Sequence, residues 1–102
     1  MPEGYDIARS IGLSLLKSLN SALNGRLDTV QRIIKINGLL RCETADFSRH
    51  PEVMNGVSDL MVQVFGPERG VHARAAYGVH SLPARVPIEI DMVVEVDSPS
   101  EI

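Results

Sequence analysis

Residues 72–96 read HARAAYGVHSLPARVPIEIDMVVEV, and they contain the clearest strand pattern in the chain. Every second residue from position 86 to 96 is apolar, namely Val86, Ile88, Ile90, Met92, Val94 and Val96. A period of two predicts a strand with one buried face and an opposite face carrying Pro87, Glu89, Asp91, Val93 and Glu95. A shorter strand over 72–79 precedes it, and the turn-rich segment 80–85 joins the two.

The segment 29–41 also has a period of two and predicts a third, longer strand. One side of this strand is apolar and consists of Val30, Ile34, Ile36 and Leu40. The other side is mixed and consists of Gln31, Ile33, Lys35, Asn37, Leu39 and Arg41. Gly38 indicates a bulge or a close approach by a neighbouring segment.

Two further stretches have helical spacing. The first begins at Asp6, which we expect to cap it, and stops at Asn24-Gly25. The second begins at residues 48–51, with Pro51 in its first turn, and ends at residues 65–67. The apolar stripe of the first is Ala8, Ile11, Gly12, Leu15, Leu16, Leu19, Ala22 and Leu23, and that of the second is Val53, Val57, Leu60, Met61 and Val64. We interpret both stripes as core.

The order helix, strand, helix, strand, strand predicts an α+β fold with both helices on one face of a mixed sheet. On the opposite face we expect Ile33, Leu39 and Val93 beside Arg74, Glu89 and Asp91. That face is too apolar for water and too charged for a dry core, and three strands leave open sheet edges. A subunit interface with a polar cleft would satisfy both features.

Composition excludes several classes of protein. The chain has 102 residues, 44% of them hydrophobic and 23% charged, which fits a single globular domain over 1–102. A net charge of -3 argues against nucleic acid as a partner. We see no signal peptide and no apolar run long enough to span a membrane. With one cysteine, a cytoplasmic location is expected.

The stretch 72–96 resembles the C-terminal signature of the YjgF/RidA family. That signature combines an arginine after a small residue, a Leu-Pro pair and an alternating strand with Ile-Glu-Ile. These are Arg74, Leu82-Pro83 and Ile88-Glu89-Ile90 in this chain. Upstream, the strand that leads to Asp46-Phe47 and the helix with NGVSDLMVQVFG are also similar to the family, so the resemblance covers roughly residues 4–96. The particular residues in these motifs resemble a divergent branch of the family.

The resemblance implies a chorismate-mutase-like fold that assembles as a homotrimer with clefts between subunits. It also implies that a β-hairpin normally precedes the first helix and supplies an aromatic residue to the cleft. This chain starts almost at that helix, so we expect a domain shortened at its N-terminus. Tyr5 does not replace the missing aromatic residue.

Arg74 is the strongest candidate for a functional residue. It shares a strand face with His72 and Ala76, and its guanidinium could pair with a substrate carboxylate, with Ala76 lining the same site. The alternative is a structural ion pair with Glu89 or Asp91. Glu89 could position or deprotonate a water, as the resemblance implies, or be a solvated carboxylate paired with Arg74 or Arg85.

Other chemistry-bearing residues fit no motif. His50, His72, His80 and Cys42 lack the spacing of compact zinc sites, so we expect no metal and no organic cofactor. Ser58 and Asn55 are interpreted as packing residues or cleft rim.

Three functions remain open at this point. The first is hydrolysis of small enamine or imine acids to keto acids and ammonia, with Arg74 and Glu89 as catalytic residues. The second is a non-catalytic trimer that binds a small carboxylate metabolite. The third, which the acidic charge and the two Tyr and two Phe disfavour, is RNA cleavage that inhibits translation.

Overall fold

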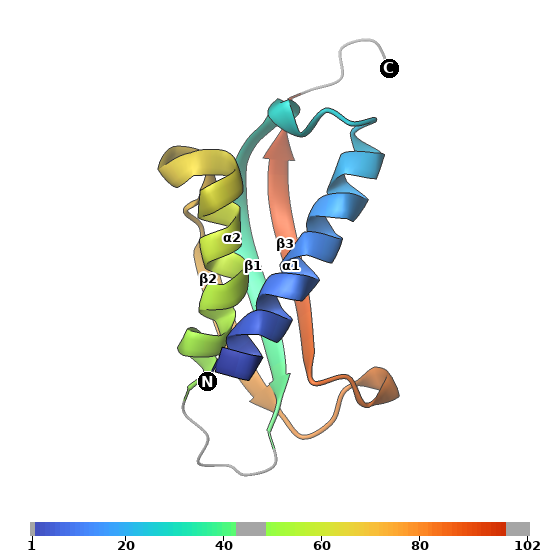
Figure 1. Ribbon diagram of the computed structural model, residues 1–102, viewed down its shortest axis with the longest axis vertical. Helices are drawn as coiled ribbons and strands as arrows, with labels where there is room; N and C mark the ends of the chain where they lie inside the picture. The colour runs from blue at the N-terminus through green and yellow to red at the C-terminus, as the bar shows by residue number, and fades with distance from the viewer. Residues whose placement is uncertain (1, 43–48, 98–102) are drawn as a thin grey trace.

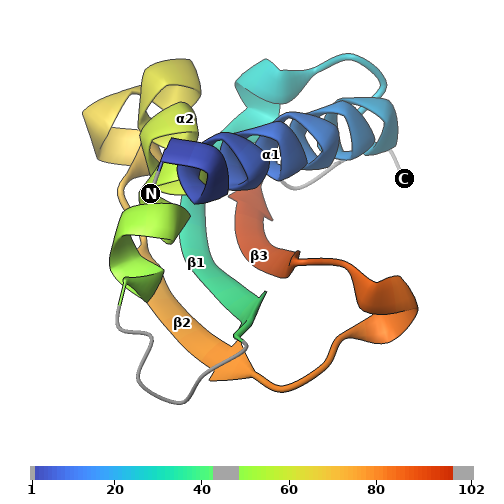
Figure 2. The same ribbon diagram turned by 60° about the horizontal axis from the view of Figure 1, so that its bottom comes forward.

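The computed structural model describes residues 2–42 and 49–97. Its elements follow the expected order: α1 (Pro2–Ala22), β1 (Val30–Arg41), α2 (His50–Gly70), β2 (Ala73–Val79) and β3 (Ile88–Val96), with short 3-10 turns at Leu27–Thr29 and Pro83–Arg85. Within the described residues the sheet has the order β2-β1-β3, with β1 parallel to β2 and antiparallel to β3. Both helices lie on one side of this sheet (Figures 1 and 2). The predicted α+β fold with a mixed sheet is confirmed.

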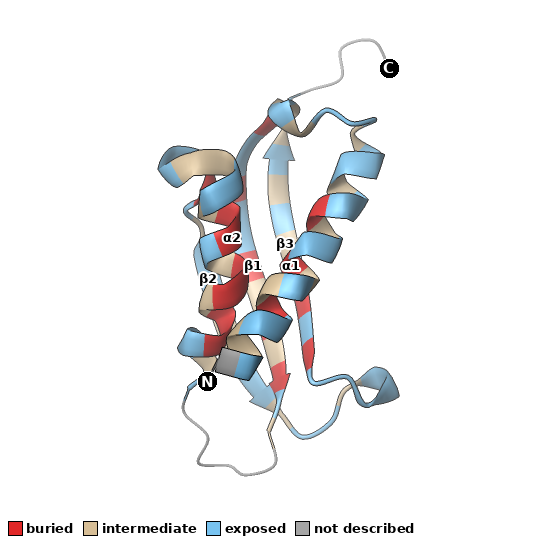
Figure 3. Cartoon of the chain, viewed as in Figure 1, coloured by how far each residue is buried: buried red, intermediate tan, exposed pale blue. Residues whose placement is uncertain are grey.

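The core lies between the helices and the sheet (Figure 3). The sheet supplies its largest fully buried side chains from β1, and α2 supplies the rest from one stripe; together they are Ile33, Ile36, Met54, Met61, Val30 and Val57. Because β1 is the central strand, its buried face fixes how both helices sit on the sheet.

The predicted face of β1 is wrong at one pair of residues. Ile33 is buried, with 1% of its surface exposed, whereas Ile34 is 38% exposed. The physical reason is two irregularities in the pairing with β3, between Val30 and Arg32 and between Ile33 and Lys35. Each inserted residue turns the following side chains over, so burial recurs at 30, 33 and 36 before the period of two returns.

Two glycines set the closest approaches between layers. A side chain at Gly38 of β1 would collide with the thioether of Met54 on α2, so Gly38 marks a close approach rather than a bulge. A side chain at Gly56 of α2 would collide with the backbone carbonyl of Tyr5. The two helices therefore cross with their backbones nearly in contact.

The strand β3 confirms the predicted alternation. Ile88 and Ile90 are buried, whereas Glu89 between them and Asp91 after them are exposed. The strand begins at Ile88 rather than at Val86, because the preceding residues belong to the loop that carries the 3-10 turn at Pro83–Arg85.

The helix ends differ from the prediction in two places. The first helix begins at Pro2, so Asp6 lies inside it rather than at its N-cap. Its predicted stop is confirmed, since Asn24 and Gly25 have positive φ values. In α2 the backbone leaves helical geometry at Gly66, as predicted, but another turn follows and ends at Gly70. Val64 was predicted as core but is exposed.

Three predicted features lie outside the described residues, namely Ser48, the Asp46-Phe47 pair and the tail at 98–102. In the part of the chain that is described, no helix is both long enough and apolar enough to cross a bilayer.

Candidate functional site

Arg74 lies on β2 and faces the helices. Its Cα pairs with that of Ile36, a buried residue on the helix face of β1. Its Nη1 atom donates to Asn55 Oδ1 at 2.8 Å and to Ser58 Oγ at 3.1 Å, both on α2. The predicted placement of Arg74 on the face opposite the helices is therefore wrong, because the register with β1 puts Arg74 on the same side as Ile36.

The two hydrogen bonds leave half of the guanidinium available. Nη1 is occupied, whereas Nε and Nη2 have no partner among residues 2–42 and 49–97. Ion pairs in the same residues join Arg26 to Asp28, Arg32 to Glu95 and Arg49 to Glu52. The alternative interpretation of Arg74, a structural ion pair with Glu89 or Asp91, is therefore not supported in these residues. An exposed guanidinium held by neutral partners keeps its charge and one edge for an anion.

Ser58 also contacts His72, so four side chains form one cluster. Ser58 Oγ lies 3.0 Å from His72 Nε2, and His72 Nδ1 lies 2.6 Å from the carbonyl oxygen of Gly70. We call Asn55, Ser58, His72 and Arg74 the α2–β2 cluster. The prediction that His72 and Arg74 share a side of their strand is confirmed by their common contact with Ser58. Ala76, two residues farther along, packs against the core.

Glu89 lies on the other face of the sheet. It sits on β3 between buried Ile88 and Ile90, so its side chain points away from the helices. Across the sheet it pairs with Leu39 of β1, which pairs in turn with Tyr77 of β2. The structure therefore does not bring Arg74 and Glu89 together within one chain.

The face of the sheet that carries Glu89 is partly apolar. Tyr77 is 55% exposed and Val93 is 48% exposed. Tyr77 alternates along β2 with Ala76, which packs against the core, and so faces outward. On the same face Asn37 Nδ2 donates to Asp91 Oδ1 at 3.2 Å, so Asp91 links β3 to β1.

Cys42 and His50 come together at the end of β1. The Cys42 Sγ atom lies 3.6 Å from His50 Nε2 and 3.3 Å from the carbonyl oxygen of Leu40. Both side chains lie over Gly78 of β2, where any larger residue would collide with them. Among the described residues, no group of three or more His, Cys, Asp or Glu side chains could hold a metal ion.

The two helices are tied together at their exposed rims. The Tyr5 hydroxyl donates to Asp59 Oδ2 at 2.7 Å, and Arg9 Nη2 donates to Gln63 Oε1 at 2.8 Å. The hydrogen bond to the Asp59 carboxylate raises the pKa of Tyr5, because ionised Tyr5 would lose that bond. These contacts position α2, which presents Asn55 and Ser58 to β2.

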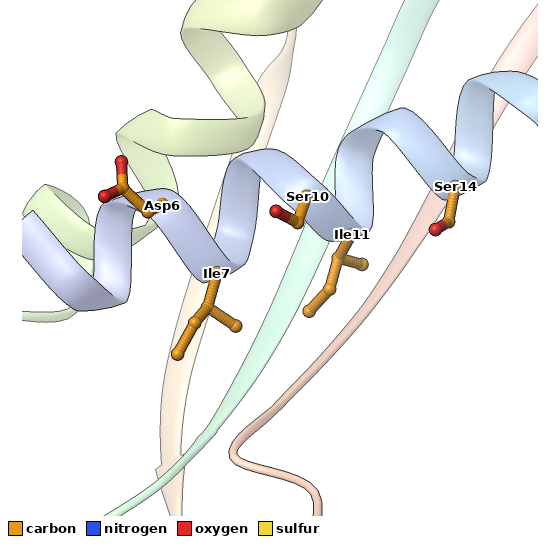
Figure 4. A pocket seen from close by; sticks show the side chains of 5 residues that line it. All are labelled: Asp6, Ile7, Ser10, Ile11 and Ser14. Carbon is orange, nitrogen blue, oxygen red and sulfur yellow. The ribbon is translucent and has the colours of Figure 1, made fainter.

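A separate open hollow of about 310 Å³ lies against α1, lined by Asp6, Ile7, Ser10, Ile11 and Ser14. Figure 4 shows Ile7 and Ile11 projecting from the same side of that helix. All five lining residues belong to α1, so this hollow shares no residue with the α2–β2 cluster.

Similar proteins were found by sequence and by structure. The chain is 40% identical over 96 residues to protein TCP17 of Trypanosoma cruzi, covering 94% of this chain and 59% of that protein. The crystal structure of protein Atu1372 from Agrobacterium tumefaciens, whose function is unknown, has a TM-score of 0.89 at 37% identity and matches 95% of this chain and 60% of its own. No protein-family model matches.

A second solved structure carries a functional name. It is called a "putative endoribonuclease" from Shewanella oneidensis and has a TM-score of 0.85 at 27% identity, over 93% of this chain and 61% of that one. The chain has a YjgF-like fold. It spans about three fifths of the length of each of these relatives.

Most of the α2–β2 cluster was not predicted from the sequence. Asn55 and Ser58 were interpreted as packing or rim residues, yet both hold Arg74. Their spacing of three on a helix puts them on one side, and the spacing of two between His72 and Arg74 does the same on a strand. These two spacings were the available signal, but only the packing of α2 against β2 shows that they meet.

Proposed function

We propose that this chain is a subunit of a homotrimer that binds small carboxylates at Arg74 and hydrolyses reactive imine or enamine acids. The products are a keto acid and ammonia. The observation that carries this proposal is the state of Arg74, whose Nη1 is fixed by two neutral acceptors while its Nε–Nη2 edge has no partner in the described chain. That edge matches the two oxygens of a carboxylate.

The reaction requires the protein mainly to position the substrate and the attacking water. An imine carbon is already electrophilic, so the reaction as proposed needs no cofactor. Arg74 would hold the carboxylate and so fix the neighbouring imine carbon. Glu89 would orient the attacking water and accept a hydrogen bond from it.

The position of Glu89 then requires a second subunit. Within one chain Arg74 faces α2, and Glu89 faces away from the helices. A site that uses both residues must take Arg74 from one subunit and Glu89 from its neighbour. The exposed apolar side chains on the Glu89 face, Tyr77 and Val93, favour burial of that face against another chain.

A second candidate function follows from the same separation. If no neighbour brings a carboxylate to Arg74, the protein is a binder of small carboxylates without catalysis. A carboxylate beside a bound anion weakens binding, so a binder gains nothing from Glu89 at the site. The two functions therefore share Arg74 and differ in the effect of Glu89.

The test generates imine acids in situ with an amino-acid oxidase and follows ammonia and keto acid above the spontaneous rate. We expect turnover by the wild-type protein, and its loss in Arg74→Ala and in Glu89→Gln. Arg69→Ala is the matched control, since Arg69 is an exposed arginine near the end of α2 and outside the cluster. Turnover in Arg74→Ala equal to wild type would exclude the mechanism.

Assembly is tested on the same samples. Sedimentation at micromolar concentration is expected to give a trimer, and a clean monomer would remove any site between subunits. If the wild-type protein releases no ammonia but carboxylates raise its melting temperature through Arg74, the binding function is the correct one.

A further inference from the structure

The α2–β2 cluster contains a hydroxyl beside a base. Ser58 Oγ lies 3.0 Å from His72 Nε2, which is hydrogen-bonding distance for proton transfer between them. The serine comes from the middle of α2, whereas the histidine comes from the segment that enters β2. Packing of the helix on the strand, and not local sequence, therefore brings the two together.

The other nitrogen of the ring determines which tautomer His72 adopts. His72 Nδ1 lies 2.6 Å from the carbonyl oxygen of Gly70, which can only accept a hydrogen bond. Neutral His72 therefore carries its proton on Nδ1 and presents a lone pair at Nε2. The Ser58 hydroxyl donates to that lone pair, which is the direction of proton transfer that activates a serine.

Donors for a developing negative charge lie beside the hydroxyl. Arg74 Nη1 donates to Ser58 Oγ at 3.1 Å and favours the alkoxide form of the serine. Asn55, one turn earlier on α2, accepts from the same Nη1 through its oxygen at 2.8 Å. Its amide nitrogen has no partner among the described residues. The remaining N–H groups of Arg74 and this amide could donate to an oxyanion formed next to Ser58.

We propose that Ser58 is a nucleophile, activated by His72, that hydrolyses small acyl esters. The Ser58 oxygen forms a bond to the acyl carbon while its proton moves to His72 Nε2. The bond from that carbon to the leaving oxygen then breaks, and His72 protonates the departing alcohol. Water, giving its proton to His72, cleaves the acyl-serine to a carboxylic acid and restores the hydroxyl. Ester hydrolysis would use Arg74, as the proposed imine hydrolysis does, but it does not depend on imine hydrolysis.

The test is covalent labelling with a dialkyl fluorophosphate. Attack by Ser58 forms the oxygen–phosphorus bond, fluoride leaves, and the proton passes through His72 to solvent. We expect the intact mass to rise by one dialkylphosphoryl group and peptide mapping to place it on Ser58. Serines without an activating base do not react with such reagents, so wild-type protein alone decides the first step.

Variants then test the role of the base. His72→Gln is expected to slow labelling and p-nitrophenyl acetate hydrolysis by about 100-fold or more. The matched controls are His80→Gln and Ser81→Ala, an exposed histidine and serine in the loop between β2 and β3, which should leave both rates unchanged.

The labelling results either support or overturn the role of Ser58 as a nucleophile. Label on Ser58 in the wild type and its loss in His72→Gln support the proposal. No label on Ser58, or labelling of His72→Gln at the wild-type rate, overturns it. These results are independent of ammonia release from imines, so this activity and the imine hydrolase can fail separately.

Discussion

Replacing Arg74 tests how the guanidinium edge holds a carboxylate. The free edge offers two N–H donors, from Nε and Nη2, since Nη1 is engaged by Asn55 and Ser58. A hydrogen bond to a charged group contributes about 1.5–3 kcal/mol, and the exposure of this site favours the low end. Two such bonds give about 3 kcal/mol, so Arg74→Ala should weaken carboxylate binding about 100-fold.

The lysine variant tests geometry apart from charge. Arg74→Lys keeps the positive charge but offers a single point donor, so we expect about a tenfold loss, corresponding to about 1.4 kcal/mol. The assay is isothermal titration calorimetry with a small 2-keto carboxylate at low salt and again at about 0.15 M salt. At the higher salt concentration, screening of the charge attraction should weaken binding to the wild-type protein. Arg69→Ala is again the control. Equal affinity in Arg74→Lys and wild type would refute the two-donor edge, and equal affinity in Arg74→Ala would refute the anchor altogether.

Two further predictions concern the packing that places the cluster. Gly56→Ala should destabilise the protein by about 2 kcal/mol in urea unfolding, because its methyl group meets the rigid backbone of Tyr5, whereas Gly38→Ala should cost less because Met54 can move. The hydrogen bond to Asp59 raises the pKa of Tyr5. The stability that this hydrogen bond contributes is therefore present below about pH 10 and is lost as the pH rises through the raised pKa. The urea midpoint of wild type should therefore fall more between pH 9 and 12 than that of Tyr5→Phe, and parallel curves would contradict this.

The sequence was sufficient for the fold class because hydrophobic period and glycine position are local signals. The alternation from Ile88 to Val96 predicts β3 with the correct face, and the stop at Asn24-Gly25 ends α1 correctly. The face of Ile33 and Ile34 was wrong, since irregular pairing with β3 depends on the partner strand and leaves no mark in the period of β1.

The candidate site was predicted less well, for a related reason. Arg74 was selected as the main candidate, but its face was wrong, because its register with β1 puts it beside Ile36 on the helix side of the sheet. Ser58 and His72 are 14 residues apart and meet only through the packing of α2 on β2. Glu89 was assigned to the same site as Arg74, and within one chain the sheet separates the two side chains.

If Arg74 of one subunit and Glu89 of its neighbour form one site, mixing subunits of two inactive variants restores that site. Arg74→Ala and Glu89→Gln proteins, each inactive, are unfolded together at equal concentration, refolded, and assayed for ammonia release from an imine acid. In a cyclic trimer about a quarter of the interfaces would then combine an intact Arg74 with an intact Glu89, so we expect about a quarter of wild-type activity. Mixed trimers that remain as inactive as the separate variants would contradict it.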